Sequence, residues 1–315
     1  MDYGKRAPDH LLARLSDNET SLVEVCKQLT EVASEAHRIT PAGEWLLDNF
    51  YLLEEQIRTA RLHLPKGYSR ELPLLANGPS VDCPRVYDIA LETIAHGDGR
   101  VDAETLSRFV SAYQTVSVLK LGELWAIPIM LRLAVIENLR RVGVRIAAGW
   151  VERNLAGVWA DAMIAAAEND PKSLILVIAD MARSNPPMVG AFVAELARRL
   201  QGRGPALALP LTWIEQRLSE SSLTIELLVQ EENQRQAADQ VSVSNSIGSL
   251  RLLGAIDWRR FVETLSIVEW TLRDDGEGVY AGMDFATRDR YRHAIERIAK
   301  RGRLSEVAVA RLAIR

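Results

Sequence analysis

Cysteine and aromatic residues are scarce in this chain of 315 residues. The two cysteines, Cys26 and Cys83, are far apart and fit no spacing typical of a metal or redox site. We interpret them as reduced structural thiols, which are typical of a cytosolic protein. Aromatic residues make up only 6% of the chain, and its seven tryptophans fall inside or at the ends of expected helices. We therefore expect the indole rings in the hydrophobic core.

The sequence also lacks a secretory signal and a membrane-spanning segment. Its first residues, MDYGKRAPDHLLARL, contain no apolar run of the kind that a signal peptide needs. The longest apolar stretch, residues 118–139, carries Lys120, Glu123 and Arg132, whereas a spanning helix needs roughly 20 nearly uncharged residues. We expect a core helix here and a soluble chain. A net charge of −4 and a pI near 5.9 argue against a nucleic-acid partner.

Motifs that carry catalysis or bind metal are missing as well. The segment TIAHGDGRVDAETL (93–106) resembles part of a calcium-binding loop, but oxygen ligands are absent at three of its positions. We interpret it as a turn followed by a helix cap at Asp102. In RDDGEG (273–278), the pair Asp274-Asp275 follows a helix and no strand, which favours a helix exit and a turn over a metal site.

Two further polar features of the sequence do not indicate a catalytic or phosphate-binding site. The stretch QEENQRQAADQ (230–240) places Glu231, Glu232, Arg235 and Asp239 at helical spacing, which favours a solvated or inter-helix polar face over a glycosidase acid and base. The five histidines are scattered, and no glycine-rich phosphate loop follows a strand. We expect no catalytic, cofactor-binding or metal-binding residue in this chain.

What the sequence does contain is a helical period of about 3.6 residues almost throughout. We predict an all-α fold, an irregular antiparallel bundle or solenoid of about 12–14 helices. Thr40-Pro41, Asp170-Pro171 and Ser305 mark helix starts, and glycines mark stops. The predicted helices cover residues 20–38, 41–63, 82–96, 102–115, 120–142, 146–169, 171–183, 187–201, 211–237, 239–256, 258–272, 284–301 and 304 onward.

The C-terminal segment differs from the rest in charge. Residues 288–315 contain nine Lys or Arg and three acidic residues, a net charge of +6, so the remainder carries −10. Such asymmetry predicts a surface that docks on an anionic membrane or on another domain. For any single arginine, a salt bridge on a solvated helix is the simpler interpretation, because Asp289 and Glu296 lie nearby. The candidate docking residues are Arg288, Arg290, Arg292, Arg297, Lys300 and Arg301.

Several long strings resemble the N-terminal region of bacterial cyclic β-1,2-glucan synthases. They include TPAGEWLLDNFYLLEEQIR (40–58), LGELWAIPIMLRLAVIENLRR (121–141), EENQRQAADQVSVSNSIGSLRLL (231–253) and GVYAGMDFATRDRYRHAIERIAKR (278–301). The similarity covers about residues 38–312 in the expected order. It implies a helical lead-in at 1–38 and a helical N-terminal domain at 39–315, with a possible internal boundary near 201–210.

The resemblance implies a large inner-membrane protein in which a processive glucosyltransferase domain, using UDP-glucose and a divalent metal, follows this region. The family's D-x-D and Q-x-x-R-W motifs have no counterpart here, and the unfinished apolar stripe of the last predicted helix suggests that more protein follows. We therefore expect a non-catalytic scaffold or regulatory domain on the cytoplasmic face of the bacterial inner membrane. Its expected partners are the downstream transferase domain and the anionic membrane surface, and it needs no cofactor of its own.

The irregular stretch 64–84 is long for a connection between helices. We predict that it forms a contact loop with Tyr68, Arg70 and Glu71 at its surface. One alternative of another class stays open, a self-contained α/α-toroid glycosidase or phosphorylase acting on glucans. Such an enzyme would carry its carboxylates and aromatic side chains on long loops at one rim.

Overall fold

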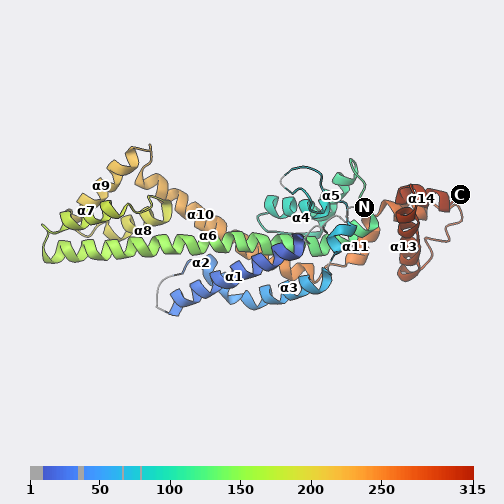
Figure 1. Ribbon diagram of the computed structural model, residues 1–315, viewed down its shortest axis with the longest axis horizontal. Helices are drawn as coiled ribbons and strands as arrows, with labels where there is room; N and C mark the ends of the chain where they lie inside the picture. The colour runs from blue at the N-terminus through green and yellow to red at the C-terminus, as the bar shows by residue number, and fades with distance from the viewer. Residues whose placement is uncertain (1–9, 35–38, 66, 79) are drawn as a thin grey trace, which may run out of the picture. The chain divides into compact units, whose positions relative to one another are not determined.

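A computed structural model describes residues 10–34, 39–65, 67–78 and 80–315 of the chain (Figure 1). Over these residues the chain is all-α, with 14 α-helices, two short 3-10 helices and no strand. An isolated bridge joins Leu74 to Pro84 within the irregular stretch. The predicted fold class is therefore confirmed, as is the expected number of helices. The α-helices are α1 (His10–Ser34), α2 (Pro41–Asp48), α3 (Phe50–His63), α4 (Arg85–His96), α5 (Ala103–Gln114), α6 (Leu121–Asn169), α7 (Leu174–Ser184), α8 (Gly190–Leu200), α9 (Ala208–Ser219), α10 (Ile225–Leu253), α11 (Trp258–Leu265), α12 (Ile267–Arg273), α13 (Phe285–Arg301) and α14 (Glu306–Ala313).

The chain packs as two compact units. Unit 1 comprises Met1–Glu19, Tyr51–Asn138 and Asn245–Arg315, and unit 2 comprises Thr20–Phe50 and Leu139–Ser244. The helices α1, α6 and α10 each contribute to both units, so these units are not continuous segments of the chain. The sequence predicts a different kind of division, into a lead-in at 1–38 and a domain at 39–315, and that division stays a prediction. The stretch 201–210 lies within unit 2.

In unit 1, the apolar stretch forms the first part of α6, which is a buried core helix, as predicted. Leu124, Met130, Leu131 and Ile136 are all inaccessible to solvent or nearly so. A separate hydrophobic cluster joins α12, α13 and α14 through Val268, Leu272, Tyr280, Ile295 and Val309 with Ala310. The C-terminal helices are thus held by their own small core.

In unit 2, the C-terminal part of α6 packs with α7, α8, α9 and the beginning of α10 (Figure 1). Ala156, Ala160 and Met163 of α6 are fully buried in this core, as are Phe192 and Leu196 of α8. After α8 the chain turns through Gly202 and Gly204, whose φ angles of 76° and 120° are readily reached only by glycine. These helices share one hydrophobic core.

The predicted caps are largely confirmed. Thr40, Asp102 and Ser305 each accept a hydrogen bond from a backbone N–H of the first turn of their helix, at α2, α5 and α14. Asp274 caps the end of α12, so the aspartate pair is a helix exit, as predicted. Asp170 instead starts a turn, in which its carboxylate accepts from the Lys172 N–H, and α7 begins only at Leu174.

Other boundaries were wrong. Gly143 was expected to end a helix but lies inside α6, where a side chain would meet Leu46 and Val25 at 3.3 Å, so close packing explains this glycine. Two helices were expected at 211–237 and 239–256. In the structure the first of them ends early, as α9 at Ser219, and α10 then runs without a break from Ile225 to Leu253. The tryptophans were expected in the core, but Trp45 and Trp270 are exposed and the other five are half-buried.

Candidate functional site

The basic helix α13 has an inner face that forms a buried ion cluster. Arg292 is completely inaccessible to solvent, and its Nη1 lies 2.7 Å from Glu269 Oε2 and 3.0 Å from Glu263 Oε1. Arg288 also pairs with Glu263, with Nη2 2.9 Å from Oε1. Glu269 accepts a further hydrogen bond of 2.7 Å from the Tyr280 hydroxyl. Two of the predicted docking arginines are therefore engaged inside the protein.

The charges of this cluster are balanced by direct contacts. Burial acts to raise the pKa of Glu269, but hydrogen bonds from Tyr280, Arg273 and Arg292 together hold that pKa below its ordinary value. Burial and the neighbouring Glu269 carboxylate raise the pKa of the Tyr280 hydroxyl. The cluster thus keeps Glu269 ionised and Tyr280 protonated at neutral pH, which suits a structural cross-link between α11, α12 and α13.

The outer face of α13 carries the remaining arginines. Arg290, Arg297 and Arg301 are exposed, follow one stripe at spacings of seven and four residues, and make no ion pair with any described residue. Beside the stripe, Tyr291 and Ile298 are 50% and 56% exposed. The helix therefore presents free cations next to apolar and aromatic groups, a combination typical of a surface that contacts an anionic interface.

The predicted contact loop lies against the end of the same helix. Lys300 Nζ is 3.0 Å from Glu296 and 3.9 Å from the Glu71 carboxylate, which comes from the loop. Burial, with a contribution from Glu71, raises the pKa of Tyr68. The side chain of Arg70 lies outside the described part of the structure. The sequence assigned Glu71 and Lys300 to separate sites, and the structure brings them together.

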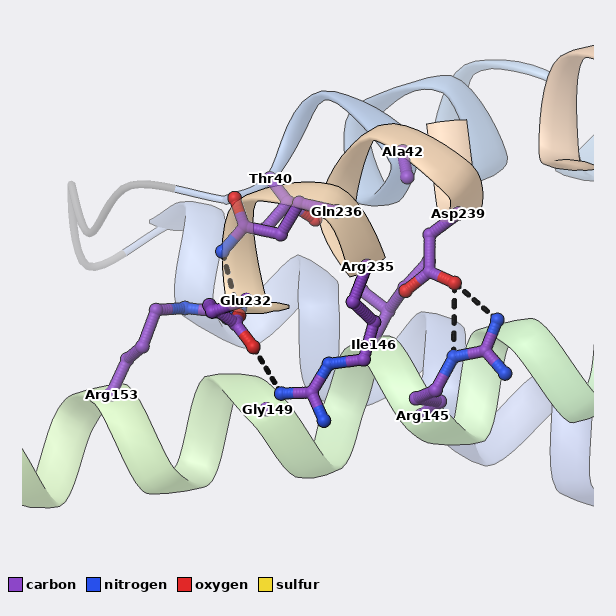
Figure 2. A pocket seen from close by; sticks show the side chains of 10 residues that line it. All are labelled: Thr40, Ala42, Arg145, Ile146, Gly149, Arg153, Glu232, Arg235, Gln236 and Asp239. Carbon is purple, nitrogen blue, oxygen red and sulfur yellow. Dashed lines mark hydrogen bonds and ion pairs between the residues drawn. The ribbon is translucent and has the colours of Figure 1, made fainter. Parts of the chain in front are cut away.

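A second polar cluster lies in unit 2 between α6 and α10 (Figure 2). Arg145 donates to Asp239, with Nε 2.9 Å from Oδ1, and Arg153 donates to Glu232 at 3.2 Å. Glu232 also pairs with Arg235 and accepts from Gln236 at 2.7 Å. Burial lowers the pKa of Arg153. The sequence left two interpretations of the polar stretch on α10, a solvated face or a face between helices. At Glu232 and Asp239 it is a face between helices.

Sequence reasoning missed the partners that α6 supplies to this cluster. Arg145 and Arg153 are eight residues apart, and Asp239 and Glu232 are seven apart in the opposite order, so the two pairs match an antiparallel helix pair. That matched spacing is the signal that could have found them. The cavity among these side chains has a volume of only about 10 Å³, space for about one water molecule. We conclude that this cluster stabilises unit 2.

The described residues contain neither a cluster of metal-binding side chains nor a membrane-spanning helix. No group of three or more His, Cys, Asp or Glu side chains there could hold a metal ion. Within the same residues, no helix combines the length and apolar character needed to cross a membrane. Cys26 and Cys83 are both buried and form no disulfide. The outer face of α13, with its exposed arginines, is taken as the candidate functional site.

Comparison with known proteins gives the family context. The chain is 34% identical over 310 residues to the cyclic beta-(1,2)-glucan synthase NdvB of Rhizobium meliloti (strain 1021). The match covers 98% of this chain but spans only 11% of the length of that relative. No protein-family model matches the chain. The resemblance inferred from the sequence is confirmed: over almost its whole length, the chain is similar to one region of a cyclic β-1,2-glucan synthase, consistent with an N-terminal region.

Proposed function

We propose that this chain is a non-catalytic N-terminal region of a cyclic β-1,2-glucan synthase that docks through α13 on the cytoplasmic face of the bacterial inner membrane. The UDP-glucose and divalent metal used for synthesis would then belong to a transferase domain elsewhere in the protein. The observation that carries the proposal is the outer stripe of α13, with Arg290, Arg297 and Arg301 free of ion pairs to described residues. Similarity to a small part of a glucan synthase supports it.

The energetics suit reversible docking. Each Lys or Arg near an anionic lipid surface contributes about 1 kcal/mol, so the three arginines contribute about 3 kcal/mol, or roughly a hundredfold in partitioning. Tyr291 and Ile298 would add contact with the headgroup region, where amphipathic aromatic side chains are favoured. The inner face of the helix would stay attached through Arg288 and Arg292. In this proposal the chain acts as a scaffold, and the α13 surface positions it on the membrane.

The test is vesicle flotation of the 315-residue chain with phosphatidylcholine alone and with phosphatidylcholine mixed with phosphatidylglycerol. We expect binding only to the anionic vesicles, and its loss in the triple variant Arg290→Glu, Arg297→Glu, Arg301→Glu. The matched control replaces the exposed Arg58, Arg100 and Arg203 with Glu, which changes the net charge equally. Absence of binding to anionic vesicles, or equal loss in the control, would contradict docking through α13.

A further inference from the structure

Helix α6 has two apolar faces where it runs through unit 2, and only one of them is covered. Ala156, Ala160 and Met163 are buried in the core of unit 2. On another side of the helix, Val151 and Val158 are 57% and 60% exposed. An apolar stripe on the open surface of a helix is unfavourable in water unless another element covers it.

The exposed stripe follows the spacing of a coiled-coil seam. Apolar residues recur at alternating intervals of four and three from Val144 to Ala165, and all of them are exposed. This 3.5-residue repeat over three heptads is the pattern by which one helix packs along another. At a rise of 1.5 Å per residue, the seam is roughly 30 Å long. Its residues are Val144, Ala148, Val151, Leu155, Val158, Ala162 and Ala165.

The side chains of this seam suit close helix approach. Three are alanines and three are valines, with Leu155 at the centre, so no bulky or charged group interrupts the stripe. Small side chains let two helix backbones come near each other. Their order, Val-Ala-Val-Leu-Val-Ala-Ala, is nearly the same in either direction. A second copy laid antiparallel would therefore meet a matching surface, as an isologous two-fold interface requires.

Charge at the two ends of the seam favours the same arrangement. Arg141 lies just before the Val144 end and Glu168 just after the Ala165 end, at nearly equal distances from Leu155 along the chain. The nearby Arg145 is already paired with Asp239. A parallel copy would bring like charges together, and an antiparallel copy would bring the basic end of each helix to the acidic end of the other. From the spacing, the near-palindromic order and this polarity, we propose that the α6 seam is the interface of an antiparallel homodimer, with its two-fold axis near Leu155.

The first test is the mass of the 315-residue chain by sedimentation equilibrium over a wide concentration range. We expect a monomer–dimer equilibrium that Val151→Glu together with Val158→Glu weakens at least about tenfold, because charges enter an apolar seam. The matched control is Ile175→Glu with Leu176→Glu, which alters two exposed apolar residues of α7 outside the seam. Circular dichroism checks that each variant keeps its helices. A monomer at every concentration, or a dimer insensitive to the seam variant, overturns the proposal.

Cysteine cross-linking tests the direction. Because Cys26 and Cys83 are buried, a cysteine placed on the seam would be the accessible thiol among the described residues. We expect Leu155→Cys to cross-link with itself, and Val144→Cys to cross-link with Ala165→Cys when the two variants are mixed. Self-cross-linking of Val144→Cys would instead require parallel helices and would overturn the proposed arrangement. The docking proposal for α13 concerns other residues, so a monomeric result leaves it standing.

Discussion

The guanidinium of Arg292 and the carboxylate of Glu269 form an ion pair of 2.7 Å in which neither side chain is exposed by more than 1%. Arg292 completes its contacts with Glu263 and with Asp289, each at 3.0 Å, and lies 5.0 Å from the centre of the Phe285 ring. A residue that looks like a surface cation in the sequence is therefore the central link of the C-terminal helices. This relationship leads to the first prediction.

Replacing Glu269 with Gln is expected to lower the free energy of unfolding by about 3–5 kcal/mol, because it leaves Arg292 buried without its main counter-charge. The measurement is urea denaturation at neutral pH. The hydrogen bonds to Glu269 hold its pKa in the folded protein below the value in the unfolded chain. The stability that Glu269 contributes is therefore present at neutral pH and is lost as pH falls through its pKa in the folded protein. The variant should lack this acid-dependent loss.

The matched control is Glu277→Gln, which makes the same change in an exposed turn only eight residues away. Its effect should stay within about 0.5 kcal/mol. Equal destabilisation by the two substitutions would show that the Glu269 cluster has no special role.

The contribution of Glu306 to stability is expected to change with pH in the opposite direction to that of Glu269. The Glu306 carboxylate accepts a hydrogen bond of 2.9 Å from the Leu121 N–H, but burial, together with the charge of Glu296, raises its pKa. The contribution of Glu306 to the stability of the fold is therefore fully present below the pKa of this group in the unfolded chain. It is lost as pH rises through the pKa in the folded protein. Gln at this position keeps an acceptor without burying a charge. Glu306→Gln should therefore be more stable than the wild type at neutral pH.

Thermal denaturation across a pH series checks this expectation. The stability difference between Glu306→Gln and the wild type should shrink steadily toward acid pH, where the wild-type carboxyl is protonated. A difference that grows on acidification would mean that the ionised carboxylate is the favoured partner of the Leu121 N–H.

Two glycines inside long helices should respond differently to the same substitution. A Cβ at Gly248 in α10 meets nothing within 4 Å, so Gly248→Ala should stabilise the chain by about 0.5–1 kcal/mol through helix propensity. At Gly143, a Cβ would meet Leu46 and Val25 at 3.3 Å, so the same change should gain less or destabilise. Melting temperatures of the two variants decide the matter, and a larger gain at Gly143 would contradict the packing described for α6.

The α6–α10 cluster of unit 2 provides a further test. Glu232→Ala removes the carboxylate that pairs with Arg153 and Arg235, and should cost about 3–5 kcal/mol because Arg153 is largely buried. Glu231→Ala, one residue earlier on the exposed side, is the matched control and should be nearly neutral. Chemical denaturation of both variants measures the difference. If Glu232→Ala is also neutral, water replaces the lost contacts at little cost.

The fold class could be predicted from the sequence because it depends on local signals. The period of 3.6 residues, the caps at Thr40, Asp102 and Ser305, and the turn at Asp274 act within a few residues and reappear in the structure. Gly143 shows the limit of such signals. Glycine ends a helix when the backbone must turn, but it also sits inside a helix where another side chain approaches closely, and only the tertiary packing distinguishes these cases.

The candidate site shows the same limit. Counting charges identifies 288–315 as a basic segment, but it does not show the direction in which each arginine points. Arg288 and Arg292 face inward because Glu263 and Glu269, 19 to 29 residues earlier in the chain, provide their counter-charges. Arg290, Arg297 and Arg301 meet no such partner among the described residues. Ion pairs between residues far apart in the sequence therefore separate the buried arginines of α13, which stabilise the fold, from the exposed arginines, which can contact a partner.

The turn after α8 has a consequence for limited proteolysis. Arg203 is exposed between Gly202 and Gly204, in a turn outside the helices, where its N–H makes one long hydrogen bond of 3.4 Å to the Leu200 carbonyl. Proteases need an extended, yielding stretch of chain, so trypsin should reach this bond well before the many arginines held within helices. A first cut after Arg203 would yield two fragments whose masses identify the site. The same turn is thus the natural place at which to insert a tag or a reporter without disturbing either neighbouring helix.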